Sequence, residues 1–144
     1  SCPEDSASHL MRRASANISS YWMAGQTIVH MRSDAEMPNN FCLLMVVGPT
    51  HEPLGVVPLS RLLRSMRPMD ILKIMDVDIR RIPANMDQED VAFLFRQYGL
   101  VSAPVADESG RLVGAIDVDD IVHVIDKEAR EDLLKFGGVQ EGDF

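Results

Sequence analysis

Residues 101–135 read VSAPVADESGRLVGAIDVDDIVHVIDKEAREDLLK, and the elements that this stretch predicts decide the fold. Residues 101–106 form a short apolar strand, residues 107–110 supply turn residues, and residues 111–116 read as the returning strand. From residue 118 to residue 135, apolar side chains recur at helical spacing and charged side chains lie mostly between them. The stretch therefore predicts a β-hairpin that leads directly into an acidic amphipathic helix.

The same pattern occurs earlier in the chain. Residues 41–47 are a continuous apolar run of strand length, residues 48–53 read as a loop, and residues 54–58 read as a returning strand. Corresponding positions lie 59 residues apart within the hairpins and helices and 64 residues apart before them: Gly55 and Gly114, Leu62 and Ile121, Met11 and Met75, Ile18 and Ile82. Neither copy has enough apolar surface to close a core alone, so we expect two α/β repeats that pack on each other.

The composition indicates a globular domain with an acidic surface. The chain of 144 residues has a formal net charge of −8, which argues against nucleic acid as a partner because phosphate binding needs a basic patch. Its apolar runs are shorter than the roughly 20 residues of a membrane span, so we expect a soluble fragment. Cys2 and Cys42 make no disulfide framework. Cys42 stands in an apolar run and is predicted to be a buried, reduced thiol, which favours the cytosol.

Short motifs in the second half carry a family resemblance. The segments 98–100 (YGL), 103–105 (APV), 107–114 (DESGRLVG) and 118–122 (VDDIV) look like the second half of a tandem CBS domain pair. The continuation, residues 126–139, resembles the point where the CBS pair of MgtE-type magnesium transporters runs into the helix that connects it to the membrane domain.

The resemblance implies an α/β fold of two CBS repeats, each of β-α-β-β-α order, packed as a pseudo-symmetric pair. It assigns residues 1–70 to a divergent first repeat and residues 71–134 to the second repeat. It also makes residues 126–144 the start of a helix or linker toward a membrane domain that is absent from this chain.

The first candidate site is acidic and lies near the end of the predicted helix. Glu128, Glu131 and Asp132 stand at i, i+3 and i+4, where like charges repel unless a cation arrives. Mg²⁺ takes one or two carboxylates and keeps several waters, so a sparse acidic face can bind it. From spacing alone, a solvated helix face partly neutralised by Lys127 and Arg130 is equally consistent. The resemblance implies that Asp120, Glu128, Glu131 and Asp132 belong to a surface where Mg²⁺ gathers.

A second acidic group opens the helix before the hairpin. Asp87 is predicted to be the N-cap, and acidic residues in the following first turn are also ordinary complements of the helix dipole. The resemblance implies that Asp87 and Glu89 lie on a Mg²⁺-binding face between subunits. Two departures put individual ion sites in doubt, because Gly99 and His123 stand where the family can carry carboxylates.

The third candidate is a nucleotide cleft. CBS pairs often hold adenosine ligands with a glycine, two apolar residues, a Ser or Thr, two further residues and an Asp. Gly114 and Asp120 keep the ends of this motif, while Asp117 replaces the hydroxyl residue. The first repeat has Pro58 and Arg61 in the two polar positions, so its site is expected to be lost.

No pattern supports catalysis. The four histidines are scattered without metal-ligand spacing, and no nucleophile elbow, phosphate loop or zinc motif occurs. We therefore expect a non-enzymatic regulatory module that senses Mg²⁺, forms a homodimer, and gates a transmembrane domain of the same protein from the cytosolic face of the membrane. The alternatives are a module of another host that binds an adenine nucleotide such as ATP or AMP, and a dimerisation module without a ligand.

Overall fold

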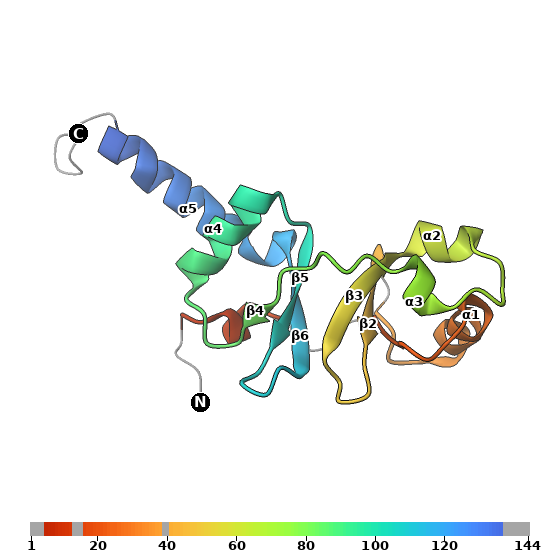
Figure 1. Cartoon of the computed structure of the whole chain (residues 1–144). Coiled ribbons are helices and arrows are strands. Elements are labelled where there is room, and N and C mark those ends of the chain that lie inside the picture. The colour runs from red at the N-terminus through yellow and green to blue at the C-terminus, as the bar shows by residue number, and fades with distance from the viewer. Residues whose placement is uncertain (1–4, 13–15, 39–40, 137–144) are drawn as a thin grey trace.

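The computed structural model describes residues 5–12, 16–38 and 41–136, which form two small α/β units side by side (Figure 1). The first unit is a three-stranded sheet in the order β1-β2-β3, with β1 parallel and β3 antiparallel to the central strand. Its elements are β1 (Asn17–Ser19), α1 (Ala24–Ser33), β2 (Leu43–Val47), β3 (Pro53–Pro58) and α2 (Leu59–Arg64).

The second unit repeats this arrangement with the sheet order β4-β5-β6 and the same parallel and antiparallel pairings. Its elements are β4 (Ile82–Pro83), α4 (Gln88–Tyr98), β5 (Ser102–Ala106), β6 (Leu112–Asp117) and α5 (Val118–Phe136). Both hairpins carry a register shift at corresponding positions, between Val46 and Val47 and between Val105 and Ala106. The predicted pair of α/β repeats is confirmed.

Alternation along the strands explains why each sheet has one buried face. In β3 and β6, buried and half-buried residues alternate strictly, which is the period of a pleated strand covered on one side. Val57 and Ile116 are fully buried in this way, and each joins the core of its own unit. Helix α4 packs against α5 over the second sheet, so both helices are fixed by the same core.

The two units exchange the segments that precede them. The 3₁₀ turn η1 (Ala7–His9) comes before β1 in the chain, yet Ala7 is buried in the core of the second unit. Conversely, α3 (Ile71–Ile74) precedes β4, and Ile71 is buried in the core of the first unit. Each unit therefore depends on a segment from the other half of the sequence for a complete core.

Each exchanged segment ends on an antiparallel bridge. Arg12 pairs with Ala115 of β6, and Asp76 pairs with Val56 of β3. These residues correspond at the 64- and 59-residue offsets of the sequence repeat, so the repeat is also a repeat of contacts.

Most of the predicted elements appear close to their expected limits, and one burial prediction was wrong. Asp107 accepts hydrogen bonds from the backbone N–H groups of Ser109 (2.9 Å) and Arg111 (3.0 Å), which closes the predicted turn. The strand expected over residues 41–47 begins only at Leu43. Cys42 therefore precedes the strand, and its thiol is free and exposed, not buried.

Helix α5 continues without a break from the second sheet through residue 136 and projects away from both units (Figure 1). The expected linker region thus begins inside this helix, and its last residues, 137–144, lie outside the described part of the chain. Over the residues that the structure describes, none of the helices combines the length and apolar character needed to cross a membrane.

Candidate functional site

Carboxylates from three separate segments line one groove of about 280 Å³ on the second unit. Asp87 and Glu89 come from the start of α4, Glu128 comes from the middle of α5, and Asp5 comes from the N-terminal segment. The groove is also lined by polar or basic side chains and one apolar residue: Gln88, His123, Lys127 and Val124. The structure therefore brings together three of the six residues that were predicted to bind metal.

Backbone contacts hold these segments in place. Asp87 is the N-cap residue of α4, as predicted, although its side chain makes no capping hydrogen bond. Ser6 forms an antiparallel bridge with Asp87, and the N–H of Gln88 donates to the carbonyl oxygen of Asp5 at 2.8 Å. The exchanged N-terminal segment thus adds a carboxylate to the groove.

Glu128 is the carboxylate of the groove that also forms an ion pair, and its side chain is only 18% exposed. Burial raises the pKa of Glu128 above its ordinary value, and the negative charge of Glu89 raises this pKa further. Arg96 acts in the opposite direction on the pKa but does not cancel these effects. The groove therefore carries negative charge that the chain itself does not fully neutralise.

On the side of Arg96, Glu128 shares a cation with Asp132. The Nη1 atom of Arg96 lies 4.0 Å from Oε2 of Glu128 and 3.4 Å from Oδ2 of Asp132. Arg96 belongs to the last turn of α4, so this contact joins the end of α4 to the outer part of α5.

The remaining predicted metal ligands lie elsewhere. Glu131 lines a separate shallow groove with Asp126 and Arg130. Asp120 forms an ion pair with Arg12 at 2.9 Å, and its other oxygen accepts the N–H of Asp117 at 2.9 Å at the start of α5. The role of Asp120 and Glu131 as Mg²⁺ ligands stays a prediction.

The donor set of the groove suits a hydrated magnesium ion. Mg²⁺ prefers oxygen ligands, and it commonly keeps several waters while binding one or two carboxylates. Across residues 5–12, 16–38 and 41–136, no three His, Cys, Asp or Glu side chains converge into a cluster that could hold a metal. One chain therefore offers single carboxylates around a groove, and not a closed chelate.

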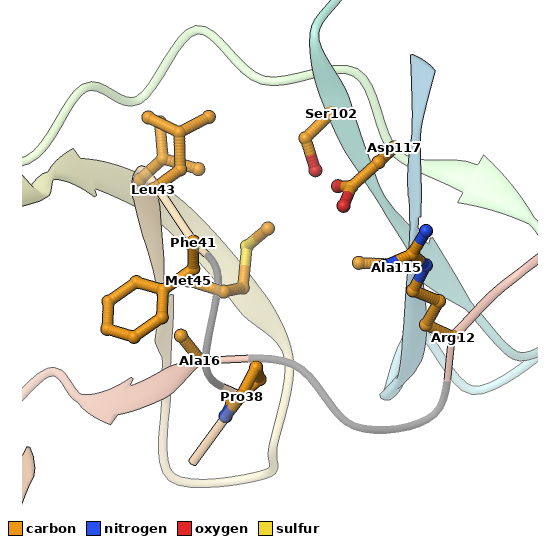
Figure 2. A pocket seen from close by; sticks show the side chains of 10 residues that line it. Arg12, Ala16, Pro38, Phe41, Leu43, Met45, Ser102, Ala115 and Asp117 are labelled. Carbon is orange, nitrogen blue, oxygen red and sulfur yellow. The ribbon is translucent and has the colours of Figure 1, made fainter. Parts of the chain in front are cut away.

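The predicted nucleotide cleft lies between the two sheets (Figure 2). One wall is apolar, with Phe41 and Met45, and the other wall carries Arg12, Ser102 and Asp117. The cavity holds about 80 Å³, whereas sites for drug-sized ligands usually enclose about 300 Å³ or more. Its free volume is therefore too small to enclose a whole nucleotide without movement of the walls.

Gly114 lies beneath the exchanged segment next to this cleft. A Cβ at Gly114 would lie 2.8 Å from the carbonyl oxygen of Arg12 and 2.8 Å from Sδ of Met11. The glycine is thus required by the packing of the N-terminal segment on β6, whether or not a ligand binds. Gly99, which stands where the family can carry a carboxylate, ends α4 in the left-handed conformation with φ of 59°.

Sequence reasoning missed three charged residues that the structure places at the candidate sites. Asp5 reaches the acidic groove only because the N-terminal segment crosses to the second unit. Arg96 meets Glu128 and Asp132 through the packing of α4 on α5, and Arg12 meets Asp120 across the sheet edge. The repeat offset is the signal that could have found Arg12, because Asp76 and Arg61 form the corresponding pair at 2.9 Å with the charges exchanged.

Comparisons with known proteins agree with this architecture. The family model for the CBS domain matches residues 70–127. The chain is 31% identical to the magnesium transporter MgtE of Bacillus subtilis over 93% of its length, and 31% identical to MgtE of Thermus thermophilus over 97%. It covers 30% and 31% of these proteins, so it spans about a third of the length of the curated relatives it matches.

Solved structures show the same relationship. The cytosolic domain of the Mg²⁺ channel MgtE in complex with ATP is similar with a TM-score of 0.77 at 28% identity, covering 85% of this chain and 50% of that one. The soluble part of a magnesium transporter gives a TM-score of 0.79 at 28% identity, covering 88% of this chain and 50% of that one. The chain therefore belongs to the CBS-domain family and is a tandem CBS pair of the type found in MgtE magnesium transporters.

Proposed function

We propose that this chain is the Mg²⁺-sensing regulatory module of a magnesium transporter, and that it is not an enzyme. The observation that carries the proposal is the acidic groove, where Asp87, Glu89 and Glu128 face one another with incomplete neutralisation. The similarity to MgtE transporters supplies the host and the ion. Asp132 and Glu131 extend the same negative charge along α5, and Asp120 contributes from the start of that helix.

The proposed mechanism is electrostatic. Without divalent ions, carboxylates that face one another repel, and this repulsion favours an open arrangement of the module. A hydrated Mg²⁺ ion that bridges carboxylates of α4 and α5 removes the repulsion and shifts the population toward a closed arrangement. Because α5 extends away from the sheet, its position can report this change to a domain that follows it.

A second copy of the chain is the proposed partner in the closed state. The groove of one chain provides single carboxylates and no three-residue cluster within its described residues, so carboxylates of a second chain would complete the coordination. The proposed assembly is a homodimer on the cytosolic face of the membrane, attached to the transmembrane domain of the same protein.

The test is the thermal unfolding midpoint of the chain against MgCl₂ from zero to about 20 mM, with NaCl added to keep the ionic strength constant. A site with a Kd of about 5 mM adds about 1 kcal/mol to the free energy of unfolding at the highest concentration, or a rise of about 3 °C. A rise that is specific to Mg²⁺ supports the proposal.

The matched variants are Glu89→Gln, which removes one charge from the groove, and Glu108→Gln, which removes one charge from the exposed β5–β6 turn. Glu89→Gln should reduce the Mg²⁺-dependent rise and Glu108→Gln should leave it unchanged. An equal response of the two variants would refute the groove as the sensor.

A nucleotide-binding module is the second candidate function. The cleft between the sheets supports it, because Arg12 offers a cation for phosphate and Asp117 offers an acceptor for a hydroxyl group. The small volume of the cleft and the engagement of Asp120 by Arg12 count against it. A midpoint that rises with ATP or AMP and is insensitive to Mg²⁺ alone would favour this candidate.

A further inference from the structure

The contact between Arg96 and α5 bears on how strongly the acidic surface can hold an ion. The guanidinium of Arg96 lies between two carboxylates that are one helical turn apart, Glu128 and Asp132. The side chains of Arg96, Glu128 and Asp132 are 38%, 18% and 50% exposed, so the contact is open to solvent on the Asp132 side. A cation of the protein itself is therefore already present where an external cation would be attracted.

The geometry of this contact is loose. Strong arginine–carboxylate pairs are bidentate, with nitrogen–oxygen distances of about 2.7–2.9 Å. Here one nitrogen, Nη1, serves both carboxylates at 3.4 Å and 4.0 Å. Exposed ion pairs of this quality contribute little to stability and are exchanged easily for other ions. Arg96 can thus leave the carboxylates without unfolding either helix.

Glu128 connects this contact to the acidic groove. The same residue lines the groove beside Glu89 and Asp87 and lies at the edge of the Arg96 contact. A positive charge that is close to Glu128 lowers the negative potential on both sides of it. Mg²⁺ that binds Glu128 must therefore compete with Arg96.

We propose that Arg96 is an internal competing cation that weakens Mg²⁺ binding at Glu128 and so sets the concentration at which the module responds. The inference rests on the proposed function, since it concerns the affinity of the same acidic surface. Its consequence is that the module stays open at low Mg²⁺ because Arg96 holds part of the site. When Mg²⁺ is abundant, the ion displaces the guanidinium.

The experiment is a calorimetric Mg²⁺ titration of the wild-type chain and the variants Arg96→Gln, Arg96→Lys and Arg130→Gln at constant ionic strength. Arg130 is the matched control because its removal changes the net charge equally, and in the described part of the chain its guanidinium forms no ion pair. Arg96→Gln should lower the apparent Kd by about three- to fivefold, the range of an exposed ion pair. Arg96→Lys should stay within about twofold of the wild type.

The outcomes separate this inference from the proposed function. A wild type that binds Mg²⁺ while Arg96→Gln binds with unchanged Kd would overturn the role of Arg96 and leave the proposed function intact. Equal tightening by Arg96→Gln and Arg130→Gln would also overturn it, because only net charge would then matter. Absence of Mg²⁺ binding in every variant would overturn both. Binding by Arg96→Gln alone would support the inference, since Arg96 would then be the obstacle.

Discussion

The exchange of segments between the two units predicts a specific weakness at Gly114. In Gly114→Ala, the new Cβ would meet the carbonyl oxygen of Arg12 and the sulfur of Met11, each at 2.8 Å. The segment would have to move away from β6, and this movement strains two hydrogen bonds. The Arg12 N–H donates to the Ala115 oxygen at 2.8 Å, and the Ala115 N–H donates to the Arg12 oxygen at 3.0 Å.

The expected loss follows from these two bonds. Each backbone hydrogen bond contributes about 1 kcal/mol net, and overpacking of a tight site typically costs about 1–3 kcal/mol. Gly114→Ala should therefore lower the free energy of unfolding by about 2 kcal/mol and the thermal midpoint by roughly 8 °C. The assay is urea unfolding followed by circular dichroism, with the midpoint measured on the same samples.

The control is Gly110→Asn in the β5–β6 turn. Gly110 has φ of 83°, and no heavy atom of a distant residue lies within 4 Å of the position that a Cβ would take there. Asparagine tolerates the left-handed region better than most other side chains, so its cost should be a few tenths of a kcal/mol up to about 1 kcal/mol. If Gly114→Ala were no more destabilising than Gly110→Asn, the N-terminal segment would not be packed on β6 as described.

Two further substitutions test the electrostatics of the second unit. Because the pKa of Glu128 is raised on folding, protonation of this group stabilises the fold; that stabilisation is complete below its ordinary value of 4.5 and is lost as the pH rises through the folded pKa. Glu128→Gln should therefore raise the thermal midpoint at pH 7 and have no such effect near pH 4, and a lower midpoint at pH 7 would contradict the cause assigned to the shift. Asp120→Ala removes the carboxylate that accepts the Asp117 N–H at the start of α5, so it should lower the free energy of unfolding by about 1 kcal/mol. A denaturant titration of Asp120→Asn, which keeps one acceptor oxygen, should show a smaller loss.

Local sequence patterns were sufficient to predict each repeat. Alternation in β6, the Asp107 turn and the spacing of apolar residues in α5 are all properties of neighbouring residues, and they appear in the structure as expected. The 59- and 64-residue offsets likewise predicted which glycines and methionines correspond, and Gly55 approaches Met75 as Gly114 approaches Met11.

The parts that escaped prediction depend on contacts between distant segments. No pattern around Asp5 or Ala7 indicates that this segment crosses to the second unit, because its partners on β6 and α4 lie more than seventy residues away. Arg96 reads as an ordinary basic residue in the last turn of a helix until α4 is packed against α5. Cys42 was assigned to a strand by its apolar neighbours, but the strand begins one residue later.

The most direct test of the central claim is to locate the ion on the molecule. Backbone amide resonances would be followed by NMR while Mn²⁺, as a paramagnetic substitute for Mg²⁺, is added at low ratios and then displaced with Mg²⁺. The account predicts that broadening begins at residues around Asp5, Asp87, Glu89 and Glu128 and is reversed by Mg²⁺. Broadening that starts at the inter-sheet cleft around Ser102 and Asp117, or uniform broadening over all acidic residues, would contradict a Mg²⁺ sensor in the acidic groove.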